Sequence, residues 1–257
     1  MIPYVELREI DLGQIVLPVF PMLILIALVT GYMRGVRRAR RLGTDLKLAG
    51  AFAFWVIACG FAGAFLLKLA YQPELFQHTN WLIRYRFSGI ASFGGLFGGL
   101  LAGIGFLWIR NVRVEQALGI LDVVAYICPL SWAIGRVGCA LVHDHPGIRS
   151  TSWLAVKYPD WPRYDLGLLG LIFLLVLSGL FGFLDRRQHA PGFFLSLGCL
   201  LTGAFRFWLD GLHVDPPRYF GWTVDQYSSI LLLTCGAVVM VFLIRKEKAL
   251  DLAHMEA

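Results

Sequence analysis

Residues 166–184 read LGLLGLIFLLVLSGLFGFL, an apolar run in which no side chain is charged. A helix needs roughly 20 such residues to cross about 30 Å of hydrocarbon, because each residue advances it by about 1.5 Å. Six further stretches meet the same requirement. The seven stretches are residues 15–33, 48–69, 89–109, 117–137, 166–184, 192–209 and 224–244. We therefore predict an all-α, polytopic integral membrane protein with about seven transmembrane helices.

The composition agrees with this arrangement. Of 257 residues, 58% are apolar and 16% are charged, whereas about a quarter of the residues in a soluble domain are charged. Seven spans leave no room for a separate soluble domain. We expect residues 1–257 to form one transmembrane domain.

Basic residues follow every second span. They are Arg34, Arg37, Arg38, Arg40, Arg41 and Lys47, then Arg110 and Arg113, then Arg186 and Arg187, and finally Arg245, Lys246 and Lys248. Short cytoplasmic loops hold the positive excess of membrane proteins, so we predict that the N-terminus is outside and the C-terminus is cytoplasmic. This bias explains the net charge of +6, and we expect no nucleic-acid partner.

Two arginines interrupt the apolar pattern near the outer ends of the fourth and sixth spans. Arg136 lies in the sequence AIGRVGC (133–139), and Arg206 lies in GAFRFWLD (203–210). An arginine within a span costs roughly 2.5–3.5 kcal/mol on insertion scales, so it normally faces a partner or a wet cavity. A guanidinium binds phosphate oxygens bidentately, and Gly135 and Gly138 would let a substrate approach closely. We interpret the pair as a site for an anionic ligand; the alternative is that each side chain reaches from its helix end to the headgroups.

Glycines recur along the third span, in SFGGLFGG (92–99) and again at Gly103. Small residues four apart allow close helix packing in lipid, which accounts for Gly95, Gly99 and Gly103. The doubling at Gly94 and Gly95 also suits a helix that begins beside a lipid headgroup. Both interpretations stay open at this point.

Together these segments resemble the bacterial prolipoprotein diacylglyceryl transferase family over most of the chain. The resemblance includes SFGGL (92–96), GRVGC (135–139) with the later Gly147, GAFR (203–206) with Asp210, and TVDQYS (223–228). It implies seven spans in the bacterial cytoplasmic (inner) membrane, with the site facing the outer side. It also implies transfer of the diacylglyceryl group of phosphatidylglycerol to the lipobox cysteine thiol of a prolipoprotein, which releases glycerol 1-phosphate.

The resemblance implies roles for individual residues. Arg136 and Arg206 would hold the phosphate, and Asp210, where the family usually has glutamate, would orient Arg206. Cys139 would form part of the site wall. Gly94, Gly95, Gly135, Gly138 and Gly147 would line the substrate site. We expect phosphatidylglycerol, the prolipoprotein lipobox segment and membrane lipids as partners, and no cofactor.

The sequence departs from the family pattern at three polar positions. The histidine usual in the third-span motif is missing, because Gly94 directly follows Phe93. Phe20 replaces a first-span tyrosine, and a glutamate expected near Gly170 is absent.

We therefore predict that His143 or His145 serves as the base, with Asp144 as its orienting carboxylate, because a histidine can accept a thiol proton at neutral pH. The alternative is a polar interfacial loop. A metal site on His143 and His145 lacks a clear third ligand, because His213 and Asp215 are in another loop. A related transferase with a different acceptor, or an anionic-lipid-binding protein without catalysis, are the alternative functions.

Overall fold

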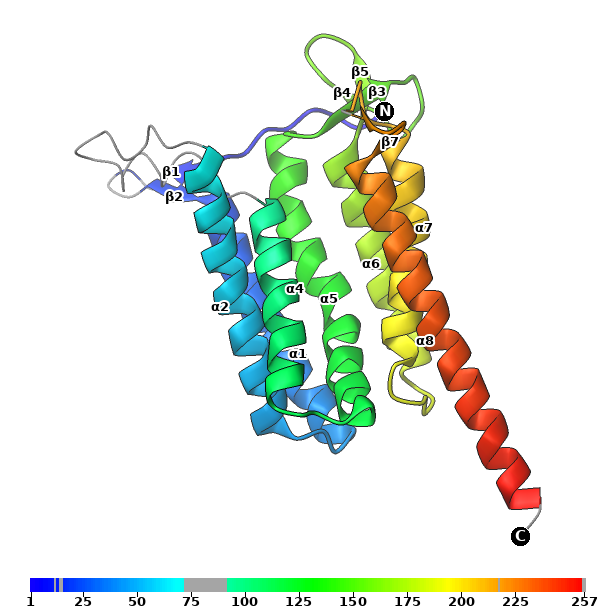
Figure 1. Ribbon diagram of the computed structural model, residues 1–257. Helices are drawn as coiled ribbons and strands as arrows, with labels where there is room; N and C mark the ends of the chain where they lie inside the picture. The colour runs from blue at the N-terminus through cyan, green and yellow to red at the C-terminus, as the bar shows by residue number, and fades with distance from the viewer. Residues whose placement is uncertain (12, 14–15, 72–91, 217, 256–257) are drawn as a thin grey trace. The chain divides into compact units, whose positions relative to one another are not determined.

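The computed structural model describes residues 1–11, 13, 16–71, 92–216 and 218–255 (Figure 1). Within them the chain is mainly helical. The helices are α1 (Val19–Arg41), α2 (Leu46–Tyr71), α4 (Ser92–Ile109), α5 (Val114–Val142), α6 (Leu166–Leu184), α7 (Phe193–Asp210) and α8 (Val224–Met255).

The prediction of an all-α, polytopic membrane protein is confirmed. Six helices of the described chain are long and apolar enough to cross a membrane, and α4 contributes a shorter apolar stretch, Phe97–Ile109. Residues 89–91 of the third predicted span lie outside the described residues. Large apolar side chains point outward along the spans, for example Leu25, Leu66 and Val176, each at least 63% exposed. Such a surface is suited to lipid.

Several helices extend beyond the predicted spans. The first span was predicted to end at residue 33, but α1 continues to Arg41, and α8 continues to Met255. Arginine and lysine are good helix formers, so the helix outlasts the apolar run. Likewise α5 continues through Val142, which places Arg136 inside the helix.

The chain divides into two compact units, Met1–Arg38 with Leu121–Ala257, and Ala39–Ile120. In the second unit, α2 packs against α4 through glycines. A Cβ on Gly94 would overlap the carbonyl oxygen of Gly63, and one on Gly98 would overlap that of Cys59. The small residues of the third span therefore permit close helix packing, as predicted, with Gly94 and Gly98 in the tightest contacts.

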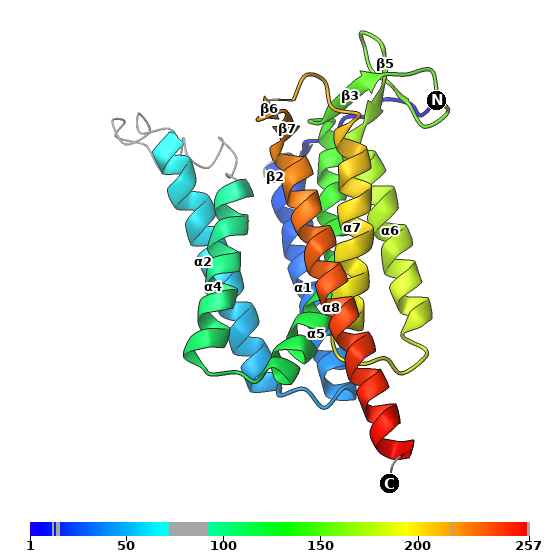
Figure 2. The same ribbon diagram turned by 45° about the vertical axis from the view of Figure 1, so that its right-hand side comes forward.

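In the first unit, α7 and α8 lie side by side (Figure 2). A Cβ on Gly203 would lie 2.9 Å from the Ser229 carbonyl oxygen, and Ser196 Oγ donates a hydrogen bond of 2.8 Å to the Gly236 carbonyl. Apolar side chains from α5, α6 and α7 form a core beside this pair. Its buried members are Tyr126, Leu177, Phe181 and Phe194.

Short strands close the end of this unit where the N-terminus lies (Figure 1). The α5–α6 connection forms an antiparallel sheet in the order β3 (Pro146–Arg149), β5 (Pro162–Asp165) and β4 (Val156–Lys157). Two hairpins pair β1 (Glu9–Asp11) with β2 (Val16–Pro18), and β6 (Arg218–Tyr219) with β7 (Trp222–Thr223). Ile2 bridges to Val156, so the N-terminal segment is tied to the sheet. The sequence did not predict these strands.

Candidate functional site

A cavity lies among α5, α6, α7 and the first turn of α8, all within the first unit. Its volume is about 140 Å³, which is room for a headgroup-sized ligand rather than a whole lipid. Its apolar wall includes Phe173, Leu174, Phe205 and Leu209. Its polar lining is Arg136, His145, Arg206, His213 and Asp225, with Thr202. The structure thus brings together the two arginines that the sequence singled out.

Both arginines lie over the same indole ring. The guanidinium carbon of Arg136 is 5.7 Å from the centroid of the Trp132 ring, and that of Arg206 is 6.0 Å from it. These are distances at which a cation is attracted to an aromatic face. Trp132 is one helical turn before Arg136, a spacing that could have identified it from the sequence.

The two arginines differ in their partners. Arg206 Nη2 donates to Asp225 Oδ1. Arg136 makes no ion pair with any residue that the structure describes. Gly170, near which a family glutamate was expected, lies beside it, and a Cβ there would be 3.8 Å from Arg136 Nε. Arg136 therefore offers a guanidinium to an incoming anion without first breaking an ion pair.

The carboxylate that orients Arg206 is Asp225 rather than the predicted Asp210. Asp210 is 4% exposed, and its carboxylate lies 3.9 Å from Nδ1 of His213. Asp225 belongs to the TVDQYS motif, but no local pattern pairs it with Arg206. The sequence feature that could have drawn attention to Asp225 is its place in the first turn of the predicted span 224–244.

His143 is placed in a structural network. Its Nδ1 is 2.5 Å from Asp165 Oδ2, and its Nε2 is 3.1 Å from the Val5 carbonyl oxygen. Its ring also stacks on Tyr4, with centroids 4.3 Å apart. Because both ring nitrogens are engaged, the proposal that His143 is the base loses its geometric support.

Asp165 is the centre of this network and is fully buried. It caps α6 by accepting from Leu168 N at 2.8 Å, and it accepts from the Tyr158 hydroxyl at 2.9 Å. Burial, followed by the Asp165 charge, raises the pKa of the Tyr158 hydroxyl above its ordinary value of 10. The network therefore fixes the start of α6 to the N-terminal segment.

His145, two residues later, lines the cavity. Its Nε2 is 3.5 Å from Asp144 Oδ1, and both side chains are close to half exposed. The predicted role of His145 and Asp144 as base and orienting carboxylate stays a prediction. Cys139, Asp144 and His145 also bring one ligand atom each within 4.8 Å of one another. Among the described residues, a metal ion could therefore be bound by this group, and not by His143 together with His145.

The glycines of the signature have different surroundings. A Cβ on Gly138 would lie 2.7 Å from Phe20 of α1, and one on Gly147 would lie 2.8 Å from the Leu212 carbonyl oxygen. Gly147 also bridges to His213, so its small size lets the β3 segment reach the turn after α7. Gly135 has open space around it, and Cys139 packs against Gly167 of α6. The predicted substrate contacts of these residues, and of Gly94 and Gly95 in the second unit, stay predictions.

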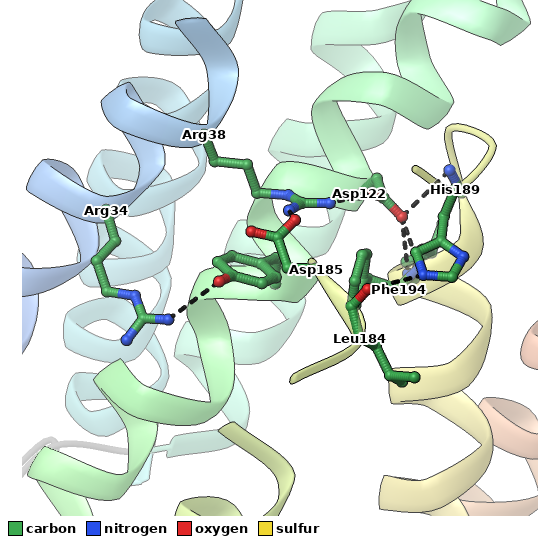
Figure 3. Close-up of polar contacts among 10 residues, drawn as sticks. Arg34, Arg38, Asp122, Leu184, Asp185, His189 and Phe194 are labelled. Carbon is green, nitrogen blue, oxygen red and sulfur yellow. Dashed lines mark hydrogen bonds and ion pairs between the residues drawn. The ribbon is translucent and has the colours of Figure 1, made fainter. Parts of the chain in front are cut away.

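A second charged cluster, which the sequence did not predict, joins α1, α5 and the segment that connects α6 to α7 (Figure 3). Arg38, which belongs to the basic run after the first predicted span, is only 6% exposed and pairs with Asp122, at 3.2 Å, and with Asp185. Asp122 Oδ1 accepts from the backbone N–H groups of Gly192, Phe194 and Leu195, at 3.1, 2.7 and 3.2 Å. Asp122 of α5 therefore caps the N-terminus of α7. The sequence feature that could have identified this residue is an acidic side chain within the predicted span 117–137.

Comparison with known proteins identifies the family of this chain. The family model of the prolipoprotein diacylglyceryl transferases matches residues 9–242. Relatives called phosphatidylglycerol–prolipoprotein diacylglyceryl transferase include one from Symbiobacterium thermophilum, 26% identical with 96% of each chain covered. Another, from Chromohalobacter salexigens, is 27% identical over 99% of this chain and 98% of its own. This chain belongs to the prolipoprotein diacylglyceryl transferase family.

Proposed function

We propose that this protein transfers the diacylglyceryl group of phosphatidylglycerol to the lipobox cysteine thiol of a prolipoprotein. The observation that carries the proposal is the pair of arginines, Arg136 and Arg206, that share one cavity beside Trp132. The names of the relatives and the family match support the choice of substrates.

The arginines suit the leaving group of this reaction. The thiol sulfur attacks the glyceryl carbon, and the bond between this carbon and the ester oxygen of the phosphate breaks. The electron pair of that bond stays on the phosphate oxygen. The phosphate therefore gains a negative charge in the transition state. Fixed cations aimed at a developing charge lower the barrier, because they need no reorganisation during the reaction. Arg136 binds the phosphate of the substrate directly. Arg206 binds the same phosphate as its negative charge increases during the reaction.

The rest of the cavity suits the lipid part of the donor. Phe173, Leu174, Phe205 and Leu209 form an apolar wall beside the arginines. This wall would receive the glyceryl carbons and the first methylenes of the acyl chains, whose burial is favourable by about 0.8 kcal/mol per CH₂. The remaining acyl chain stays in the surrounding bilayer.

His145 is the proposed base. It lines the same cavity as the arginines, and an imidazole accepts a thiol proton at neutral pH. Asp144, 3.5 Å away, would orient the ring and stabilise the imidazolium. His145 would thereby replace the histidine that the third-span motif of this chain lacks.

The multi-pass architecture supports a location in the bacterial cytoplasmic (inner) membrane. The basic residues in the last turns of α1, after α6 and in the C-terminal part of α8 would lie on the cytoplasmic side. The cavity would then face the outer side, where a translocated prolipoprotein presents its cysteine.

The test is a transfer assay with purified protein in vesicles that contain phosphatidylglycerol. A lipobox peptide is supplied, and its gain of a thioether-linked diacylglyceryl group is measured by mass spectrometry. We expect Arg136→Ala and Arg206→Ala each to lower the rate about 10²- to 10³-fold, the usual loss for one transition-state charge donor. Arg149→Ala, an arginine that lies over Trp161, is the matched control and retains the wild-type rate.

Two results would refute the proposal. One is wild-type protein that binds phosphatidylglycerol but forms no thioether, which would favour a lipid-binding function without catalysis. The other is full activity in both cavity variants, which would show that the arginines do not carry the reaction.

A further inference from the structure

The two arginines of the cavity differ in whether a carboxylate neutralises their charge. Arg206 is paired with Asp225, whereas Arg136 has no ion-pair partner in the described part of the chain. Apart from its histidines, the lining therefore carries two positive charges and one negative charge. Its net charge matches one negative charge on a ligand.

Asp225 is held firmly at the start of α8. Thr223 Oγ1 accepts from Gln226 N at 3.0 Å, and Gln226 Oε1 accepts from Thr223 N at 3.1 Å. This reciprocal pair is a capping box, and it fixes the backbone of the turn that carries Asp225. The helix dipole also favours a negative charge there.

The ion pair itself can open. The side chains of Arg206 and Asp225 are 29% and 31% exposed, so water and a ligand can replace their contact. The cost of separating such a part-exposed pair is modest. Arg206 can therefore exchange Asp225 for a phosphate when the negative charge of the phosphate increases.

The proposed reaction produces that increase, and the inference rests on the proposed function. Phosphatidylglycerol is a phosphodiester with one negative charge. When carbon–oxygen cleavage leaves a phosphate monoester and the thiol proton passes to the base, the phosphate carries about −1.5 to −2 near pH 7. Two unopposed arginines would hold this product more tightly than the substrate and slow its release.

We propose that Asp225 is a positioning residue that acts through Arg206 to weaken the binding of the dianionic product. It competes with the phosphate monoester for Arg206 and repels its second charge. The monoanionic substrate, which Arg136 binds first, is affected less. Asp225 thus lowers the affinity of the cavity for the dianionic product more than its affinity for the monoanionic substrate.

The test measures equilibrium binding of glycerol 1-phosphate, a dianion, and glycerophosphoglycerol, a monoanionic diester, to the purified full-length protein. We expect Asp225→Asn to tighten glycerol 1-phosphate about tenfold and the diester at most about threefold, because one charge a few Å away acts through a part-exposed cavity. Asp225→Glu keeps the charge and should restore wild-type selectivity. Asp160→Asn, an exposed carboxylate paired with Arg163, is the control that changes neither affinity.

In the transfer assay, Asp225→Asn should lower the inhibition constant of glycerol 1-phosphate about tenfold and change the KM for phosphatidylglycerol less. Equal changes in the two constants, or no change, would overturn the proposal. If Asp225→Asn does not fold, the wild type decides: it should prefer the dianion over the diester by no more than about threefold, and a preference above about tenfold would contradict the role of Asp225. Absence of transfer by the wild type would instead refute the proposed function, and the binding comparison would still decide the charge selectivity.

Discussion

The two histidines of the outer loop should respond differently to the same substitution. His143→Asn removes the imidazole from the Asp165 network, and asparagine tolerates the φ of 54° at this position better than most residues. The shorter side chain cannot reach both Asp165 and the Val5 carbonyl. His145→Asn makes the same change two residues later, at a side chain that is 44% exposed.

The magnitude follows from the contacts of His143. Its hydrogen bond to the buried Asp165 carboxylate contributes about 1.5–3 kcal/mol, and the bond to Val5 about 0.5–1 kcal/mol. Its stack on Tyr4 contributes about 0.5–1.5 kcal/mol. Asparagine recovers a part of this, so we expect a net loss of about 3 kcal/mol. In a chain of this size that lowers Tm by roughly 6–12 °C.

Thermal unfolding in detergent and the transfer assay together distinguish the two roles. We expect His143→Asn to lower Tm while the protein that remains folded transfers within a few-fold of the wild-type rate. His145→Asn should keep Tm and lower the rate about 10²- to 10⁴-fold, the usual contribution of a general base. An unchanged Tm in His143→Asn, together with a large loss of rate, would refute the assignment.

Three further changes test other parts of the structure. Asp122→Asn removes one of the two carboxylates that pair with Arg38 and should cost about 1–3 kcal/mol, the usual range for a weakened hydrogen bond to a charged group; unfolding in denaturant measures it, and an unchanged midpoint would contradict the buried pair. Gly147→Ala places a Cβ 2.8 Å from the Leu212 carbonyl oxygen and should lower the transfer rate at unchanged insertion; a wild-type rate would show that the contact does not matter. Because folding raises the pKa of Tyr158, its protonated hydroxyl contributes stability that is fully present below about pH 10, the ordinary tyrosine value, and is lost as the pH rises further. Stability measured against pH should therefore fall above pH 10 in the wild type and less steeply in Tyr158→Phe, and identical slopes would exclude this contribution.

The spans were predictable because the bilayer sets a length and an apolar composition that can be read one residue at a time. The span predicted at residues 166–184 coincides with α6. The helix ends were less predictable. The length of an apolar run indicates which residues lie in the hydrocarbon, but the backbone hydrogen bonds of a helix can continue beyond it. Arg34 to Arg41 continue α1 for this reason.

The arginine pair of the site was predictable for a related reason, since a charge inside a span is expensive and needs an explanation. Its partners were not predictable. Asp210 is one turn from Arg206 in sequence, yet Asp225 reaches it from another helix. Likewise His143 and His145 are equivalent in sequence, and the contacts of His143 with Asp165, Val5 and Tyr4 separate them. Pairings between elements depend on packing, which local patterns do not encode.

If the cavity around Arg136 carries diacylglyceryl transfer, the protein should complement a strain that lacks this activity. A bacterial strain depleted of its own transferase receives the wild-type protein or Arg136→Ala, and the thioether lipid on a reporter lipoprotein is measured. We expect the wild type to restore the lipid and the variant, inserted to the same level, not to restore it. Restoration by Arg136→Ala, or failure of inserted wild-type protein to lipidate the reporter, would contradict it.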